Sequence, residues 1–231
     1  MKKIKAILYD VDGTLLDFET QEEVALSYCF KKYNLGELSE EKLELYKRIN
    51  LGYWEMFEKN LITKEKLVVK RFEDYLEALG VKLNAEEVND TYFSKLGDTI
   101  VFKDNSYELV KSLKGKIKQY VVTNGAIRVQ KTKLAKSGFD KLMDDVFISD
   151  EVGYQKPRKE FFDAIKNRLG DIANDEILIV GDSLTSDMKL ADNCNLISCF
   201  YNPKKKDYKV DFKIDYEISD LNEVKKICQL D

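Results

Sequence analysis

Short runs of apolar residues recur along the chain, and each run ends in small or polar residues. The runs are rich in Val, Ile and Tyr and fall at residues 4–9, 117–122, 146–149, 177–180 and 196–200. None of them alternates strictly between apolar and polar positions, which is typical of parallel strands buried on both faces of a sheet. A weaker run at 210–214 predicts a sixth strand.

Helical patterns separate the later strands. Apolar residues recur at helical spacing near 105–114, 126–137, 158–169, 185–193 and 220–229. Strands that alternate with helices along the chain are typical of α/β proteins with a parallel sheet covered by helices on both faces. The pattern therefore predicts an α/β fold with a doubly wound parallel sheet.

The alternation of strands and helices is interrupted at residues 19–99, because this segment contains no strand-like run. Thr20 with Glu23 has the pattern of a capping box, in which two side chains satisfy backbone groups at a helix start. Asn84 with Glu87 has a similar pattern. Both pairs predict helices in this segment.

The apolar residues of this segment support a bundle. Two stretches carry them at spacings of three and four, the second before Gly80, which is placed to end a helix: Leu43, Tyr46, Ile49, Tyr53 and Phe57, then Phe72, Tyr75, Leu76 and Leu79. We predict about four helices in a domain at 19–99, inserted into a core domain of 1–18 and 100–231. Helices that pack directly on the sheet are the alternative.

The composition narrows the set of partners. A net charge of −4 provides no basic field for a nucleic-acid polymer or an acidic membrane, so an anionic substrate would need a local cation. No apolar run approaches the ~18 residues of a membrane-spanning helix, and residues 6–9 are too few for a signal-peptide core. We expect a cytoplasmic protein, either a monomer or a small homo-oligomer.

Cysteine and histidine usage constrains the chemistry. The four cysteines are scattered without a C-x-x-C pair, so we expect reduced core residues at Cys29, Cys194, Cys199 and Cys228. The chain has no histidine, which excludes Ser–His–Asp and Cys–His catalysis and His-ligated zinc. Hydrolytic chemistry would have to use carboxylates, hydroxyls, lysines and a hard metal ion.

Polar residues follow each of the first four predicted strands. In chain order they are Asp10, Asp12, Thr123, Asn124, Lys156, Asp182 and Asp187. The carboxyl ends of parallel strands lie at one edge of a sheet, where open α/β sheets bind ligands. We therefore expect these side chains to converge on one pocket.

The acidic residues of this set require a positive charge. Asp10 and Asp12 are two residues apart, so on an extended chain they would point to the same side and repel each other. Three or four carboxylates cannot all stay ionised together without a cation or a shared proton. Oxygen ligands without Cys or His favour Mg²⁺ or a similar hard ion.

The same residues fall into four motifs. D-x-D-G-T-L at 10–15, Thr123, Lys156-Pro157 and G-D-x-x-x-x-D at 181–187 resemble, in order and spacing, the four motifs of the haloacid dehalogenase (HAD) superfamily. The resemblance covers the whole chain, because 19–99 matches the helical cap of that family. It implies a Rossmann-like core and Mg²⁺-dependent hydrolysis of phosphate esters through an aspartyl-phosphate.

The resemblance also implies roles for the four aspartates. Asp10 would be the nucleophile and a metal ligand, because its carboxylate can form an acyl-phosphate. Asp12 would protonate the leaving alcohol, activate the attacking water and offer its backbone carbonyl to the metal. The true dehalogenases of the superfamily lack this second aspartate. Asp182 would bind Mg²⁺ directly, and Asp187 would act through water or by orienting Lys156.

Thr123 and Lys156 would contact the phosphate. The Thr123 hydroxyl and the backbone N–H groups of Asn124 and Gly125 suit an anion at a strand end. Lys156 would neutralise the nucleophile and the phosphoryl oxygens. A helix N-cap for Thr123 and a solvated surface position for Lys156 are the structural alternatives.

A narrower resemblance links the chain to bacterial pyrimidine 5′-nucleotidases. It rests on residues 15–18, 50–54, 71–72 and 148–153. Gly13 departs from that subgroup, whose members often carry an acidic residue there. Four residues of the inserted segment are candidates for contacting a nucleobase, with burial in the bundle core as the alternative: Tyr53, Trp54, Arg71 and Phe72.

Together these features predict a phosphatase acting on a small phosphorylated metabolite, with nucleoside 5′-monophosphates favoured. A sugar phosphatase or phosphoglucomutase of the same architecture is the first alternative. A non-catalytic binding domain is the second. The motif residues disfavour it, because binding alone does not need a nucleophile, an acid and a metal ligand together.

Overall fold

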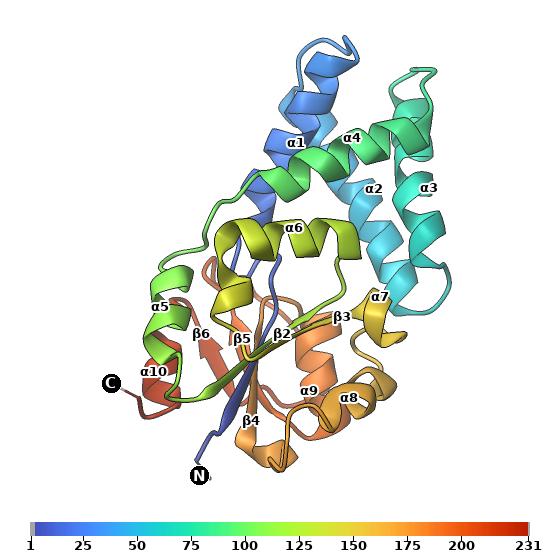
Figure 1. Cartoon of the computed structure of the whole chain (residues 1–231). Helices are drawn as coiled ribbons and strands as arrows, with labels where there is room; N and C mark the ends of the chain where they lie inside the picture. The colour runs from blue at the N-terminus through green and yellow to red at the C-terminus, as the bar shows by residue number, and fades with distance from the viewer. Residues whose placement is uncertain (1–2, 231) are drawn as a thin grey trace. The chain divides into compact units, whose positions relative to one another are not determined.

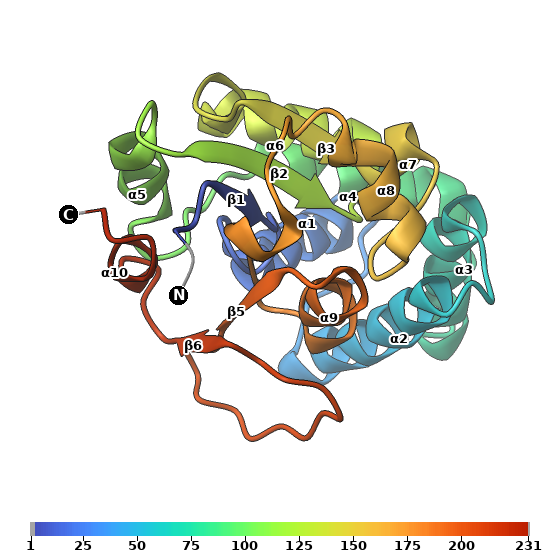
Figure 2. The same ribbon diagram turned by 90° about the horizontal axis from the view of Figure 1, so that it is seen from below.

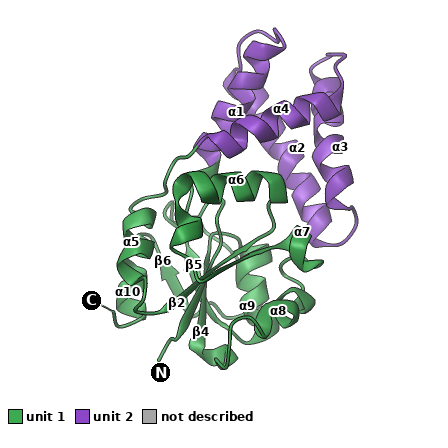
Figure 3. Ribbon diagram, in the orientation of Figure 1, with its two compact units in different colours: residues 1–18, 100–231 green, residues 19–99 purple. Residues whose placement is uncertain are grey.

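The computed structural model describes residues 3–230 and divides into two compact units. One unit comprises Met1–Phe18 with Ile100–Asp231, and the other comprises Glu19–Thr99 (Figure 3). We call the first the sheet unit and the second the helical unit, and each is described by itself.

A six-stranded parallel sheet forms the centre of the sheet unit (Figure 1). Its strands are β1 (Ala6–Tyr9), β2 (Lys118–Thr123), β3 (Asp145–Ile148), β4 (Ile177–Gly181), β5 (Ile197–Tyr201) and β6 (Tyr216–Ile218), in the spatial order β3-β2-β1-β4-β5-β6. All neighbouring strands pair in parallel. The predicted doubly wound sheet is therefore confirmed, with β1 beside both β2 and β4 at its centre.

The sixth strand lies later in the chain than predicted. The run at 210–214 forms no strand, and β6 begins at Tyr216. Asp215 explains the shift, because its carboxylate accepts hydrogen bonds from the backbone N–H and the hydroxyl of Ser198. These bonds fasten the chain beside β5, and Tyr216 then pairs with Cys199.

Helices cover both faces of the sheet (Figure 2). α5 (Ser106–Leu113), α6 (Ile127–Ser137) and α10 (Glu223–Ile227) pack on one face. α8 (Lys159–Lys166) and α9 (Lys189–Cys194) pack on the other. Residues next to each other on β1 enter opposite clusters, as Ile7 and Leu8 do, and both are fully buried. This two-sided burial accounts for strands that lack polar alternation.

Short elements complete the sheet unit. α7 (Ser149–Val152) follows β3 and was not predicted. A single π-helical turn, η3 (Leu184–Met188), precedes α9, and two 3₁₀ turns lie at Phe139–Lys141 and Asn174–Glu176. The four cysteines are free and buried, as predicted.

The helical unit contains α1 (Phe18–Lys32), α2 (Glu40–Glu58), α3 (Lys64–Ala78) and α4 (Ala85–Asp98). Asn84 caps α4 as predicted, because its side-chain oxygen accepts bonds from the backbone N–H groups of Glu86 and Glu87. The predicted cap at Thr20 is wrong. α1 begins at Phe18, so Thr20 lies within its first turn.

The interior of the helical unit is aromatic. Tyr46 lies 5.3 Å from Phe72, 5.2 Å from Tyr75 and 5.7 Å from Tyr92, measured between ring centroids. Such ring pairs stabilise a core beyond the area that they bury. Among the described helices of the whole chain, none combines the length and the apolar character needed to cross a membrane.

Candidate active site

Lys156 joins two carboxylates at the carboxyl end of the sheet. Its Nζ lies 2.7 Å from Oδ1 of Asp10 and 2.6 Å from Oδ1 of Asp187, and it donates a third bond to the Val122 carbonyl at 2.9 Å. Lys156 is 1% exposed and Asp187 is fully buried. The third donor is thus satisfied by the backbone of β2, and the ammonium is held in one position.

Three separate segments of the chain contribute the side chains that meet here. Asp10 follows the last residue of β1, and its backbone N–H bonds to the Val180 carbonyl of β4. Asp187 comes from η3, after β4. Lys156 lies in the loop between α7 and α8. This place, beside the central strand where the strand order reverses, is where open α/β sheets bind ligands.

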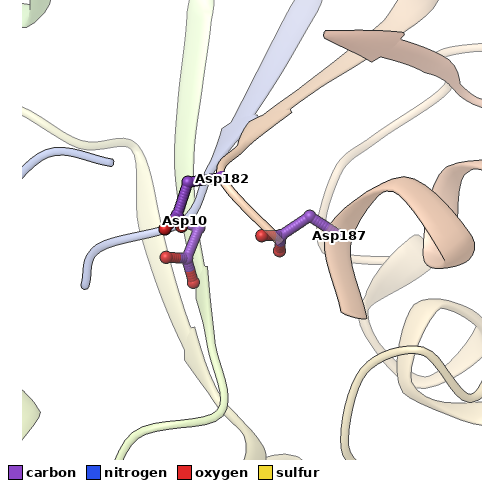
Figure 4. Close-up of side chains that lie close together, drawn as sticks. All are labelled: Asp10, Asp182 and Asp187. Carbon is purple, nitrogen blue, oxygen red and sulfur yellow. The ribbon is translucent and has the colours of Figure 1, made fainter. Parts of the chain in front are cut away.

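Three carboxylates form a compact group. Asp10, Asp182 and Asp187 each offer an oxygen, and these oxygens lie within 4.8 Å of one another. Figure 4 shows the Asp187 carboxylate turned toward those of Asp10 and Asp182. Both oxygens of Asp187 already have donors within the protein, because its second oxygen accepts the Ser183 N–H.

Two of the three carboxylates keep acceptor capacity beyond their bonds to side chains. Oδ1 of Asp10 bonds to Lys156, and Oδ1 of Asp182 accepts the Thr14 hydroxyl at 3.2 Å. Within residues 3–230, no other side chain donates a hydrogen bond to either carboxylate. An all-oxygen donor set without Cys or His fits Mg²⁺, which usually binds one or two carboxylates and keeps several waters.

The electrostatics of the group favour a cation. Burial, and then the Asp187 carboxylate, raise the pKa of Asp182 to about 7, although part of its side chain is exposed to solvent. Burial raises the pKa of Asp10 well above its ordinary value, and Lys156 offsets this only in part. Burial alone would lower the pKa of Lys156, but Asp10 and Asp187 together raise it. The single positive charge of Lys156 therefore does not neutralise the negative charge of the three carboxylates.

Two glycines give the carboxylates room. Gly13 has a φ of +94°, and a Cβ there would lie 2.2 Å from Oδ2 of Asp182. A Cβ on Gly181 would lie 2.2 Å from Oδ2 of Asp187. Neither position accepts a larger residue without moving a carboxylate. Glycine at position 13, the departure from the nucleotidase subgroup, thus fits the present placement of the Asp182 carboxylate.

Thr123 and Asn124 lie beside Lys156. The Thr123 hydroxyl accepts the Gly125 N–H at 3.0 Å, and no described residue accepts its own proton. The Asn124 side chain holds the backbone of Lys156 through two bonds of 2.9 Å, one given and one received. Thr123 thus keeps a donor for an anion, whereas the side chain of Asn124 positions Lys156. A phosphate contact through the Asn124 backbone stays a prediction.

The Asp12 carboxylate does not join the other three. Its Oδ1 lies 2.6 Å from the Lys133 ammonium, and its Oδ2 accepts a bond of 2.6 Å from the Gln130 side chain. The sequence predicted that Asp12 would surround the same site as Asp10; its carboxylate is held by residues of α6 and not by Lys156, and its role at the site stays a prediction. The two neighbouring aspartates are instead neutralised by two different lysines. A metal contact through the Asp12 backbone carbonyl stays a prediction.

Lys133 and Gln130 were not predicted from the sequence. Both lie on α6 and are almost fully buried, at 0% and 1% exposure. The sequence held one signal, because Lys133 falls four residues after Val129 and therefore on the same apolar face of the helix. A lysine on a buried face needs a negative partner.

The four candidates in the helical unit differ in burial. Arg71 and Phe72 are 2% and 1% exposed, and the Arg71 guanidinium donates to the side-chain oxygens of Asn50 and Asn89. Tyr53 is half-buried and donates to Asp74, and Trp54 is half-buried against Phe57. Burial favours the structural alternative for Arg71 and Phe72, and substrate contact by any of the four stays a prediction.

Comparison with known proteins places the chain in one family. The haloacid dehalogenase-like hydrolase family matches residues 4–195. HAD-hydrolase YfnB of Bacillus subtilis is 32% identical over 231 residues, covering 100% of this chain and 98% of YfnB. Pyrimidine 5′-nucleotidase PynA of Streptococcus pneumoniae is 30% identical over 200 residues, covering 86% of this chain and 84% of PynA.

A further relative and a solved structure agree with this placement. A glyceraldehyde 3-phosphate phosphatase of Methanocaldococcus jannaschii is 28% identical over 231 residues, covering 98% of this chain and 97% of that enzyme. The crystal structure of YfnB bound to magnesium has a TM-score of 0.93 and covers 99% of this chain and 100% of that chain. The chain therefore belongs to the family of haloacid dehalogenase-like hydrolases.

Proposed function

We propose that this hydrolase cleaves phosphomonoesters through a phosphorylated Asp10 and depends on Mg²⁺. The observation that carries the proposal is the state of the Asp10 carboxylate. Its Oδ1 is held by Lys156 at 2.7 Å, its Oδ2 accepts no side-chain bond from the described residues, and the carboxylate as a whole lies in a group with that of Asp182. A fixed carboxylate with one open oxygen suits a nucleophile.

The residues divide the reaction into two steps. Oδ2 of Asp10 attacks phosphorus, the phosphorus–oxygen bond to the leaving group breaks, and the departing oxygen takes a proton from Asp12. Water then attacks the same phosphorus and gives a proton to Asp12, which releases inorganic phosphate and restores the Asp10 carboxylate. Phosphomonoester hydrolysis is among the slowest uncatalysed reactions, so a covalent route is physically reasonable.

The remaining residues neutralise and orient the phosphoryl group. Lys156 provides the fixed positive charge beside the nucleophile. The Thr123 hydroxyl has a proton to donate to a phosphoryl oxygen. Mg²⁺, which the carboxylates of Asp10 and Asp182 would hold, would neutralise the negative charge of these groups and of the phosphate.

Nucleoside 5′-monophosphates are the substrates that we favour. PynA, a pyrimidine 5′-nucleotidase, supports this choice, as do the half-buried aromatic residues Tyr53 and Trp54 of the helical unit, which we assign as the cap. Aromatic side chains can stack on a nucleobase. The glyceraldehyde 3-phosphate phosphatase relative supports a second candidate, a small sugar phosphate.

Phosphate release from a panel of esters tests the proposal. The panel contains pyrimidine and purine nucleoside monophosphates, sugar and triose phosphates and phosphoserine, each with Mg²⁺ and with EDTA. We expect Mg²⁺-dependent release that is greatest with pyrimidine monophosphates. Greatest release from sugar or triose phosphates would support the second candidate, whereas release that persists in EDTA would remove the metal from the account.

A further inference from the structure

α6 carries two buried donors that do not touch the Asp10 group. The side chains of Lys133 and Gln130 each bond to a different oxygen of Asp12, at 2.6 Å in both cases. We propose that Lys133, with Gln130, is a positioning residue that fixes the Asp12 carboxylate for proton transfer. The inference rests on the proposed phosphatase function, in which Asp12 is the acid and base.

Burial makes the Lys133 contact unusual for a lysine. Its side chain is fully buried, and that of Asp12 is 23% exposed. An isolated buried ammonium is costly, and the cost is offset only by a well-placed partner. The Asp12 carboxylate provides that partner, and the Phe18 ring lies 5.1 Å from the Lys133 nitrogen. The Lys133 contact therefore fixes the position of the Asp12 carboxylate in addition to neutralising its charge.

Two contacts fix the orientation of the carboxylate as well as its place. A carboxylate held at one oxygen can still rotate, whereas one held at both oxygens by separate donors cannot. Each carboxylate oxygen has about two acceptor positions, so the contacts leave capacity on Asp12 to exchange a proton with a ligand. The arrangement suits an acid and base that must meet a leaving group at one angle.

The same chain segment carries the candidate phosphate contacts. β2 ends at Thr123, and α6 begins four residues later at Ile127. A Cβ on Gly125 would lie 2.1 Å from Nε2 of Gln130, so the Gln130 side chain packs directly on this loop. One continuous segment therefore sets the phosphate contacts and the Asp12 contacts relative to each other.

α7 braces the start of this helix. The Asp150 carboxylate accepts the Ile127 N–H at 2.8 Å, and Glu151 pairs with Lys131 at 2.6 Å. The N-cap residue, Ala126, provides no side-chain bond of its own. Asp150 thus replaces the missing cap, and it stabilises the end of α6 nearest the phosphate loop.

Leaving-group dependence separates a positioning role from a structural one. A 4-nitrophenolate leaves without help from an acid, whereas an alkoxide needs a proton. We expect Lys133→Met to lower kcat/KM about 100-fold for the alkyl phosphate that turns over fastest, and to change kcat/KM for 4-nitrophenyl phosphate by less than about 3-fold. Lys136→Met is the matched control, because it removes an exposed lysine from the last turn of the same helix.

A double-mutant cycle with Asp12→Asn completes the test. If Lys133 acts through Asp12, then Lys133→Met causes no further loss for the alkyl ester once Asp12 is Asn. Equal losses for both esters, or a full additional loss in the Asp12→Asn background, would overturn the inference. Gln130→Met provides a second, uncharged variant with the same expected selectivity, should Lys133→Met not fold.

The outcomes also separate this inference from the proposed function. A wild-type protein that hydrolyses phosphomonoesters, with Lys133→Met and Gln130→Met both unchanged in leaving-group selectivity, contradicts the positioning role alone. A wild-type protein that releases phosphate from no ester contradicts both.

Discussion

The ammonium of Lys156 lies 2.7 Å from Oδ1 of Asp10, and both side chains are nearly buried. The same ammonium lies 2.6 Å from Asp187, so one lysine links the candidate nucleophile to the residue after β4. We expect Lys156→Met to lower kcat at least about 100-fold, because the reacting carboxylate loses its fixed positive charge.

The stability of this variant should fall as well. Removing one partner of a buried ion pair costs about 3–5 kcal/mol, since the remaining charges are left uncompensated. Urea denaturation measures the loss. Lys159→Met is the control, because Lys159 is exposed and pairs with Asp163 on the surface of α8. Equal losses of unfolding free energy in Lys156→Met and Lys159→Met would show that the buried ion pairs of Lys156 stabilise the protein no more than a surface ion pair does.

Gly13 tests the steric argument at the metal site. We expect Gly13→Ala to weaken Mg²⁺ binding about 10-fold or more, because the new Cβ would displace the Asp182 carboxylate. Gly115→Ala is a matched control, since Gly115 also has a positive φ of +78° but has open space around it. Both variants should lose about 1–2 kcal/mol from backbone strain. Calorimetric titration with Mg²⁺ should distinguish them, and equal affinities would contradict the steric account.

The raised pKa of Asp182 predicts how pH and Mg²⁺ act together. This carboxyl has a pKa of about 7 in the folded, metal-free protein. A raised carboxyl pKa stabilises the fold below about pH 4, and that contribution is lost as the pH rises through about 7. Mg²⁺ competes with the proton, so its stabilising effect should be larger at about pH 8 than at about pH 6.

Thermal unfolding with and without Mg²⁺ measures this effect. The rise in Tm on adding Mg²⁺ should be larger at the higher pH. Asp182→Asn should reduce the rise at both pH values and weaken its pH dependence. A rise in wild-type Tm that is the same at both pH values would show that Asp182 does not exchange its proton for the metal.

Arg71 separates a structural from a substrate-binding role in the helical unit. Its guanidinium lies among aromatic rings, 5.2 Å from Phe72 and 5.1 Å from Tyr92, and bonds to two asparagine oxygens. We expect Arg71→Met to cost about 2–4 kcal/mol of unfolding free energy, because both oxygens lose their donor. Urea denaturation measures this, with exposed Lys70 on the same helix replaced by Met as the control. Undiminished stability with a raised KM for nucleotides would instead indicate a direct substrate contact.

Much of the sheet could be predicted because its signal is local. Five apolar runs correspond to β1 to β5, and their polar ends were correctly expected at one edge of a parallel sheet. β6 was misplaced because its position depends on the contact between Asp215 and Ser198, which lie 17 residues apart. Strand propensity favoured the more apolar stretch at 210–214, but the tertiary hydrogen bond between Asp215 and Ser198 places the strand after it.

The candidate site was predictable where motifs follow strands and not where a helix face turns inward. Asp10, Asp182 and Asp187 come together as the topology requires. The direction of the Asp12 side chain could not be predicted, because it depends on Lys133, which lies 121 residues later in the chain. Most lysines are solvated, so pattern alone does not select this one.

Trapping the covalent intermediate tests the central claim most directly. The protein is mixed with its best phosphate ester and Mg²⁺, quenched in acid and treated with borohydride, which reduces an aspartyl-phosphate to homoserine. Peptide mass spectrometry then reads the residue at position 10. We predict homoserine at that position in the wild-type protein and none in Asp10→Asn, which should also release no phosphate. Continued phosphate release by Asp10→Asn, or modification of a different residue, would contradict the account.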